Sequence, residues 1–454
     1  MIAAPRERPV APERAAVQHK SAIPCTPALA PRYRAPTETR TDTVPTRAEC
    51  EALDAADPLA GWRERFALPE NVIYLDGNSL GPLPEATAGL LDDVARGHWG
   101  RDLITSWNRH GWVDLPRAVG AKIAHLIGAG AHEVIVADSI SVNLFKLVAA
   151  ALGLRPGRRV VLSERDNFPT DLYVVQGLSE LLGERIELRL VETVELESSL
   201  DQDTALLMLS HVDYRTGHVH DMARLTAAAQ AAGALALWDL AHSAGALPVD
   251  LNECGVDLAV GCGYKYLNGG PGAPAFLFVA ERWHDVARQP ITGWFGHAEP
   301  FGFRSEYRAA PGVQRFLAGT PPILSLKALE AGVDLLLGVD PGELRAKSVQ
   351  LTELFIRLVL ERCAGHGLEL ASPRDAKHRG SHVALRHAEA YAIMQASIAR
   401  GVIGDFRAPD LLRFGFAPLY VRFVDVFDAA LTLREILADR SWDRPELKRR
   451  AAVT

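Results

Sequence analysis

The feature that most constrains the fold is a unit that recurs between residues 134 and 262. Each copy is a short apolar run, such as VIV or LLMLS, followed by a polar loop and a helical pattern. Successive units of this kind predict strand–helix–strand crossovers around a mainly parallel sheet, and therefore an α/β fold. Ligands of such sheets bind at the carboxyl ends of the strands, so site residues are expected in the loops that follow the apolar runs.

Two of these apolar runs lie close together in the chain. The first, residues 235–238, leads directly to Asp239, and the second, residues 256–262, leads to Lys265 in a glycine-rich loop. A carboxylate and a lysine at neighbouring strand ends suit a site that holds a protonated heterocycle and forms an imine. The alternative is that both are ordinary surface residues at the ends of strands.

A candidate phosphate-binding site lies where the first helix of the recurring unit begins. Asp138, Ser139 and Ser141 are residue types that are favoured at helix N-caps. The free N–H groups of a helix N-terminus, together with a serine hydroxyl, can bind a phosphate group. Plain helix capping explains the same residues equally well.

Composition excludes several classes of protein. The chain has 454 residues, of which 48% are hydrophobic and 23% charged, as is typical of a globular protein. Its formal net charge of −7 argues against nucleic acid or an anionic membrane as the main partner. No uncharged apolar run reaches the roughly 20 residues that span a bilayer. Its five scattered cysteines predict neither a disulfide framework nor a metal site, and a cytoplasmic location is expected.

The chain is expected to divide into three parts. Residues 1–48 are rich in Pro, Ala and Arg and are expected to form a disordered tail. An organelle transit peptide, or a start codon assigned too far upstream, would look the same. Residues 49–326 predict a large domain whose N-terminal segment packs on a smaller one. Residues 327–454, where helices alternate with antiparallel-looking strands, predict that smaller α+β domain.

Specific motifs follow one another between about residue 70 and residue 440. In chain order they include LDGNSLGPLP, SISVNL, FPTDLY, HVDYRTG, WDLAHSAGA, GCGYKYLNGGPG, GTPPI and FAPLY. Their order resembles that of the kynureninases, which are enzymes dependent on pyridoxal 5′-phosphate (PLP) with the aspartate-aminotransferase-like fold, known as fold type I. The resemblance implies a large PLP-binding domain with a mainly parallel central sheet, followed by a smaller α+β domain.

The resemblance also implies a set of cofactor-binding residues. Lys265 would bind the aldehyde of PLP covalently, Asp239 would pair with the pyridinium nitrogen, and Phe168 would stack on the ring. Thr320 would reach a phosphate group from the neighbouring subunit, which implies a homodimer with composite active sites. The other implied cofactor-binding residues are Ile140, Ser141, Asp171, Ser210, His242, Tyr264 and Trp294.

Substrate recognition is implied at three positions. Arg413 matches the arginine that binds the substrate α-carboxylate in this family, and its alternative is a surface arginine on a strand. A guanidinium makes a two-point contact with a carboxylate that a lysine cannot make. Trp99 together with Thr320 resembles the bacterial type, which prefers L-kynurenine to its 3-hydroxy form. Tyr264 would relay protons late in the reaction.

The activity implied is the hydrolytic cleavage of the Cβ–Cγ bond of L-kynurenine to anthranilate and L-alanine, in tryptophan catabolism or NAD biosynthesis. One alternative is another enzyme of the same fold, a cysteine desulfurase or an aminotransferase. The cysteines argue against a desulfurase, because none lies in a recognisable mobile loop of the second domain. The other alternative is a catalytically silent binding protein, which would be expected to lose Lys265, Asp239 or Arg413.

Overall fold

The computed structural model describes residues 44–451. The predicted disordered tail, residues 1–48, therefore lies almost entirely outside the described residues. Helix α1 (Arg47–Ala55) begins at the end of that segment. A capping box fixes its start, because the side chain of Thr46 accepts from the N–H of Glu49 and the Glu49 carboxylate accepts from the N–H of Thr46.

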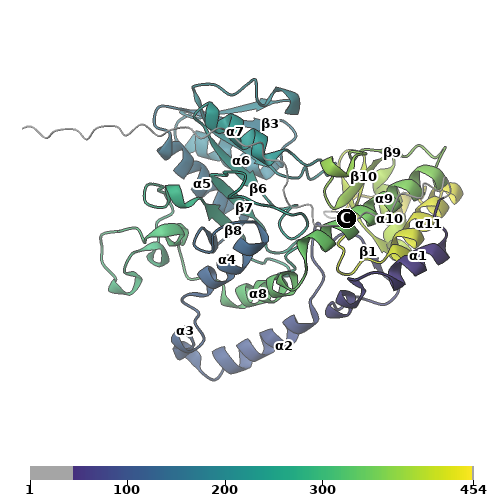
Figure 1. The fold of residues 1–454 in the computed structure, drawn as a ribbon, viewed down its shortest axis with the longest axis horizontal. Coiled ribbons are helices and arrows are strands. Elements are labelled where there is room, and N and C mark those ends of the chain that lie inside the picture. The colour runs from purple at the N-terminus through teal and green to yellow at the C-terminus, as the bar shows by residue number, and fades with distance from the viewer. Residues whose placement is uncertain (1–43, 452–454) are drawn as a thin grey trace, which may run out of the picture.

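A seven-stranded sheet forms the centre of the larger part of the molecule (Figure 1). Its strands run in the order β2-β8-β7-β6-β5-β3-β4. Every pairing from β7 to β4 is parallel, and only β8 runs antiparallel to its neighbours β2 and β7. The predicted mainly parallel α/β sheet is thus confirmed. The strands are β2 (Val134–Val136), β3 (Val160–Glu164), β4 (Glu187–Val191), β5 (Thr204–Ser210), β6 (Leu235–Asp239), β7 (Leu258–Gly261) and β8 (Phe276–Val279).

Helices cover both faces of this sheet, so its strands are buried on two sides. In β6, Leu235 and Leu237 face a core shared with α5 and α6, whereas Ala236 and Trp238 face a core shared with α4, α7 and α8. Burial on both faces explains why the strands read as continuous apolar runs. The helices of this part are α2 (Glu85–Asp93), α3 (Ser106–Arg109), α4 (Leu115–Leu126), α5 (Ile140–Leu154), α6 (Pro169–Leu181), α7 (Met222–Ala231) and α8 (Ile323–Leu337).

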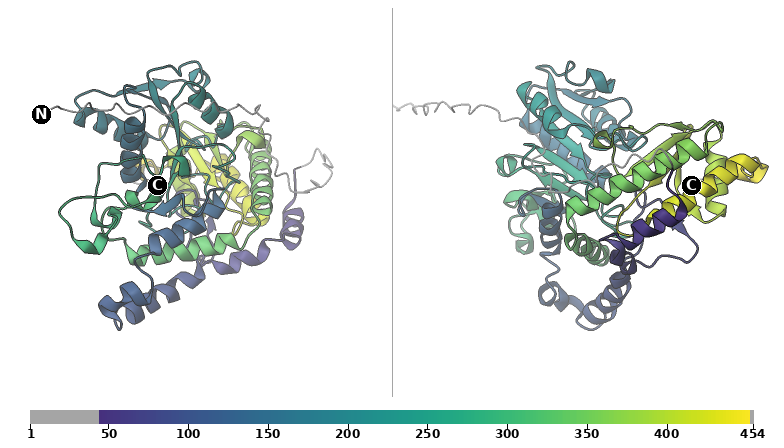
Figure 2. Two further views of the ribbon diagram at one scale, coloured as in Figure 1. Left: turned by 60° about the vertical axis from the view of Figure 1, so that its left-hand side comes forward. Right: turned by 45° about the vertical axis from the view of Figure 1, so that its right-hand side comes forward.

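The C-terminal part contains a second sheet, which is antiparallel and has the strand order β12-β13-β10-β9. Helices α9 and α11 pack against each other beside it, and α1 packs on α11 (Figure 2). The elements are α9 (Pro341–Arg362), β9 (Glu369–Leu370), β10 (His382–Arg386), α10 (Ala390–Ala399), β12 (Asp405–Arg407), β13 (Leu411–Gly415), α11 (Phe423–Asp439) and α12 (Pro445–Lys448).

An early segment of the chain bridges the two sheets. Strand β1 (Ile73–Tyr74) pairs in parallel with β11 (Val402–Ile403) of the C-terminal part. The turn that follows β1 then reaches the other part, where the N–H of Gly81 donates to the carbonyl of Tyr264 at 2.8 Å. Residues of this turn therefore lie between the lysine loop and the second sheet. Among the described residues, no helix is long and apolar enough to cross a membrane.

Candidate active site

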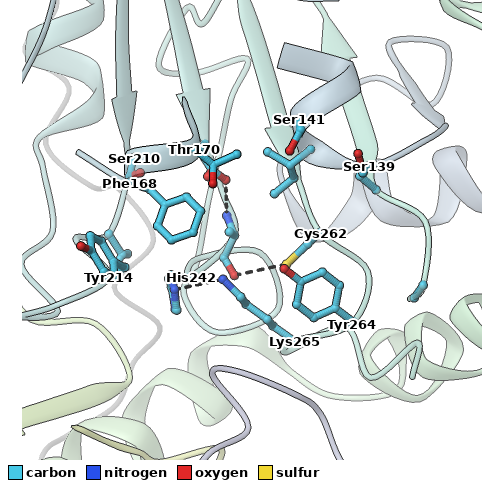
Figure 3. Close-up of a pocket in the computed structure, with 16 residues that line it drawn as sticks. Ser139, Ser141, Phe168, Thr170, Ser210, Tyr214, His242, Cys262, Tyr264 and Lys265 are labelled. Carbon is cyan, nitrogen blue, oxygen red and sulfur yellow. Dashed lines mark hydrogen bonds between the residues drawn. The ribbon is translucent and has the colours of Figure 1, made fainter. Parts of the chain in front are cut away.

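A cavity of about 270 Å³ opens at the carboxyl ends of β5 and β6, facing the N-terminus of α5 (Figure 3). Much of the predicted site is gathered around it. The predicted residues that line the cavity are Ile140, Ser141, Phe168, Ser210, Asp239, His242, Tyr264 and Lys265. Residues from the ends of five strands, β2, β3, β5, β6 and β7, thus meet at one sheet edge, as the position of strand ends in such sheets requires.

Lys265 lies in the loop after β7, and its Nζ is 3.1 Å from Nε2 of His242. Burial, reinforced by the positive charge of Lys265, holds the pKa of His242 well below its usual value. The imidazole is therefore neutral and can accept a hydrogen bond from the lysine. The early turn holds the loop from the other side, because a Cβ at Gly81 would lie 2.4 Å from the carbonyl oxygen of Lys265.

Two buried acids lie close to each other, and one of them, Asp239, lines the cavity. Asp239 ends β6, and its Oδ1 accepts from the N–H of Ala241 at 2.8 Å. Burial raises the pKa of Asp239 to about 6, against the opposing effect of the Lys265 charge. Asp171, in the first turn of α6, is fully buried, and neither of its carboxylate oxygens has a hydrogen-bond partner in the described part of the chain. Burial and the nearby Asp239 raise its pKa well above normal.

The N-terminus of α5 forms the opposite wall of the cavity. Ser139 is its N-cap and accepts from the N–H of Val142 at 3.4 Å. The first N–H groups of a helix have no intrahelical partner, and here they belong to residues that line the cavity. Just before the cap, Asp138 has a φ of +47° and forms an ion pair with the buried Lys146. Capping and an open anion site therefore coexist at this terminus.

Several residues line the cavity without having been predicted as site residues. The ring of Tyr214 meets that of Phe168 edge to face, with centroids 5.1 Å apart. Both residues lie in loops that directly follow predicted strands. That position in the sequence could have identified Tyr214 as a candidate site residue. The remaining unpredicted lining residues are Thr170, Val212, Ala241, Cys262, Ala273 and Ala275, whereas Ser139, which also lines the cavity, was a candidate at the helix N-terminus.

Five predicted residues do not line the cavity: Asp171 and Arg413 are buried beside it, and three others are exposed. Trp99, at the end of a π-helical turn, is 61% exposed, and Trp294 is 36% exposed. Thr320 is also exposed, and none of the three lines the cavity. Trp294 instead packs edge to face with Phe301 in an aromatic loop, with ring centroids 5.6 Å apart.

Arg413 lies behind the cavity rather than in its wall. It is only 1% exposed, so the alternative of a surface arginine is wrong. Its Nε donates to Oδ1 of Asp405 at 2.8 Å, and its Nη1 donates to the carbonyl of Tyr214 at 2.5 Å. Since Tyr214 lines the cavity, the guanidinium is one hydrogen bond away from it.

Comparison with known proteins agrees with this geometry. Residues 344–433 match the family model described as the kynureninase C-terminal domain. A curated kynureninase from Burkholderia mallei (strain SAVP1) is 53% identical over 414 residues, which are 90% of this chain and 100% of the relative. A kynureninase from Pseudomonas fluorescens is 51% identical with the same coverage. The chain belongs to the kynureninase family. As a member of the kynureninase family it is a PLP-dependent hydrolase, and the desulfurase, aminotransferase and silent-protein alternatives are not favoured.

Solved structures support the fold of this kynureninase-family chain. A cysteine desulfurase from Thermococcus onnurineus NA1 superposes with a TM-score of 0.71 at 19% identity, covering 84% of this chain and 98% of the other. The cystine C-S lyase C-DES, in complex with cysteine persulfide, gives a TM-score of 0.69 at 18% identity, covering 82% and 98%. At such low identity the likeness concerns the fold alone, and it agrees with the expected fold type I.

Proposed function

We propose that this chain cleaves the Cβ–Cγ bond of L-kynurenine by hydrolysis, giving anthranilate and L-alanine, with PLP held in the cavity between β6 and α5. The observation that carries the proposal is that Lys265 and the buried Asp239 line one cavity, with a second buried acid, Asp171, beside Asp239. Asp239 accepts one backbone hydrogen bond, and both carboxylate oxygens of Asp171 lack a partner in the described part of the chain, so a protonated ring nitrogen would supply a donor that these acids need. Sequence identity of 53% to a kynureninase over 90% of the chain supports the same reaction.

The residues present fit the cofactor. The open N–H groups of Ile140 and Ser141 suit its phosphate, and the ring of Phe168 is placed to stack on its own ring. Asp239 would hold the proton on the ring nitrogen, and the nearby Asp171 adds a second buried acid whose charge that proton would offset. When bound, PLP accepts the electron pair that is released at the substrate Cα.

Lys265 performs the first proton transfer. Its amine would hold the aldehyde of the cofactor in the resting enzyme and would be free while substrate is bound. The free lysine then removes the Cα proton and can return it elsewhere on the bound substrate. His242, 3.1 Å from Nζ and neutral, gives the released amine a fixed hydrogen-bond partner.

Tyr264 serves the later steps. Burial raises the pKa of its hydroxyl far above neutrality, so the hydroxyl keeps its proton at physiological pH. Water adds to the side-chain carbonyl, its oxygen stays with the anthranilate carboxylate, and the Cβ–Cγ bond breaks. Cβ then needs one proton to become the methyl group of L-alanine, and Tyr264 at the cavity wall is the donor we assign.

Arg413 binds the α-carboxylate of the substrate. The three exposed residues predicted at the site act from a second subunit. Thr320, Trp294 and Trp99 are exposed on the single chain, as a composite site in a homodimer requires. Trp99 with Thr320 favours L-kynurenine over 3-hydroxykynurenine. Residues 49–326 form the PLP-binding domain, residues 327–454 the smaller domain, and the enzyme works in the cytoplasm.

Anthranilate fluorescence tests the reaction directly. The purified PLP-loaded protein should release anthranilate and L-alanine in equal amounts when L-kynurenine is added. The same protein should release no sulfide from L-cysteine, which separates it from a desulfurase of the same fold. Cofactor colour without anthranilate release would overturn the proposal in favour of another PLP reaction.

A further inference from the structure

A cluster of four charged side chains lies between the early turn and the second sheet. Asp405 and Arg413 are directly opposite each other on β12 and β13. Asp405 also accepts from Nη2 of Arg407 and from Oγ of Ser79, both at 2.6 Å. Asp76, in the early turn, is the second carboxylate of the cluster. Its Oδ1 is buried and has no hydrogen-bond partner in the described part of the chain.

The early turn is pressed closely onto β13, which fixes Asp76 beside the arginines. The N–H of Gly415 donates to the carbonyl of Leu75 at 2.6 Å. A Cβ at Gly415 would lie 1.8 Å from Oδ1 of Asn78, so only glycine allows this approach. The turn therefore has little freedom to move Asp76 away from its charged neighbours.

The charges of the cluster balance before any ligand binds. Two carboxylates, Asp76 and Asp405, face two guanidiniums, Arg407 and Arg413. Asp405 already takes hydrogen bonds from Nε and Nη2 of Arg413. A substrate carboxylate that binds Arg413 adds a third negative charge to a buried site. Such a charge is costly unless a cation or a proton accompanies it.

Asp76 is the group best placed to take that proton. Burial, and next the negative charge of Asp405, raise its pKa to about 7. In contrast, Arg413 and Arg407 outweigh burial at Asp405 and lower its pKa to about 2. Of the two acids, Asp405 thus stays ionised, while Asp76 titrates near neutrality.

The other titratable groups around Asp76 cannot balance the added charge. Tyr74, Tyr266 and Tyr420 face it from β1, from the lysine loop and from the segment before α11, and burial raises the pKa of each. They are therefore neutral and stay so. Next to the arginines, His382 has a pKa held well below normal by burial and by Arg413, so it too is neutral.

We propose that Asp76 takes up a proton when a substrate carboxylate binds Arg413, so that the buried cluster keeps its charge balance. This inference rests on the proposed role of Arg413 in carboxylate binding. Asp76 acts through the cluster and is a positioning residue rather than a catalytic one. Binding of amino-acid ligands should therefore be linked to proton uptake, whereas ligands that lack a carboxylate should show no such linkage.

Calorimetry on the PLP-loaded enzyme tests the inference without measuring turnover. L-alanine is titrated at about pH 8 in two buffers with different ionisation enthalpies, which gives the number of protons taken up. The wild-type protein should take up about one proton more than Asp76→Asn. The matched control is Asp334→Asn, which removes an exposed acid that pairs with Lys122 and should behave as wild type.

A second measurement needs no variant and guards against misfolding of Asp76→Asn. Wild-type enzyme is titrated with L-alanine and with L-alaninamide, and each proton count is corrected for ionisation of the free amine. Greater uptake with L-alanine supports the inference. Equal uptake, with L-alanine bound more tightly, would overturn it and leave the role of Arg413 intact. Equal affinity for both ligands would overturn the role of Arg413 and the inference with it.

Discussion

Nζ of Lys265 lies 3.1 Å from Nε2 of a histidine, His242, that burial keeps neutral. The two residues follow neighbouring strands, β6 and β7, and their loops meet because parallel strands end at the same sheet edge. The hydrogen bond fixes the amine at the wall of the cavity. It also provides a partner for that amine at the stage when the lysine is free.

Replacing His242 by leucine should therefore slow proton removal from the substrate Cα. We expect kcat to fall by roughly 10- to 100-fold, because the released lysine loses the hydrogen-bond acceptor that lies 3.1 Å from its Nζ. A deuterium isotope effect at Cα should increase at the same time. His242→Gln, which keeps a polar group, should retain more activity, and equal rates for all three proteins would contradict the assigned contact.

The buried acid Asp239 predicts a pH dependence for the cofactor-free protein. Its pKa is about 6 in the fold, above the unfolded value near 4, so the folded state binds more protons between these values. The contribution of Asp239 to the free energy of unfolding is therefore fully present below about pH 4. It is lost as the pH rises through about 6. Asp239→Asn should raise the unfolding free energy near pH 7 by about 1–3 kcal/mol.

Urea unfolding of the cofactor-free proteins measures this effect. The difference between Asp239→Asn and wild type should vanish below about pH 3, where the wild-type acid is protonated in both states. In the PLP-loaded proteins the sign should reverse, because the ring nitrogen then supplies the missing proton. A variant that is less stable than wild type without cofactor at neutral pH would contradict the proposed environment of Asp239.

Arg413→Lys should weaken substrate binding. The guanidinium bonds Asp405 and Tyr214 at once, and a lysine cannot reproduce this geometry. We expect kcat/KM for L-kynurenine to fall by about 10²- to 10³-fold, with PLP affinity unchanged. Arg386→Lys is the control, because Arg386 lies on β10 of the same sheet but pairs with Asp410 at the surface. A similar loss in both variants would show a structural effect on the sheet.

The early turn gives a prediction about cofactor affinity. A methyl group at Gly81 would clash with the carbonyl of Lys265 at 2.4 Å, so Gly81→Ala must displace the lysine loop or the turn. We expect weaker PLP binding, measured by the absorbance of the bound cofactor. Gly89→Ala is the control, because Gly89 lies in α2 with nothing within 4 Å and alanine favours helices. Unchanged PLP affinity in Gly81→Ala would contradict the packing of the turn.

Much of the sheet and of the cofactor cavity could be predicted from the sequence. Burial on both faces leaves an unbroken apolar run such as residues 235–238, and the polar residue after the run marks the strand end. This reasoning placed Asp239 and Lys265, because local sequence and sheet topology together determine where strand ends lie.

The rest depends on contacts between distant segments. The pairing of Arg413 with Asp405 follows from the register of β12 and β13, and its bond to Tyr214 spans 199 residues. No local pattern reports either contact. Trp99 and Thr320 do not line the cavity in one chain, so the roles we propose for them require a second subunit, which a single sequence does not place.

We propose that Lys265 holds the cofactor, and chemical trapping tests this assignment most directly. The PLP-loaded enzyme is reduced with borohydride, digested and examined by mass spectrometry, and Lys265→Ala is assayed for anthranilate. We predict a pyridoxyl label on Lys265 and none on Lys146, the buried lysine near the N-terminus of α5. Lys265→Ala should bind PLP reversibly and release no anthranilate. A label on another lysine, or turnover by Lys265→Ala at a rate close to wild type, would contradict the account.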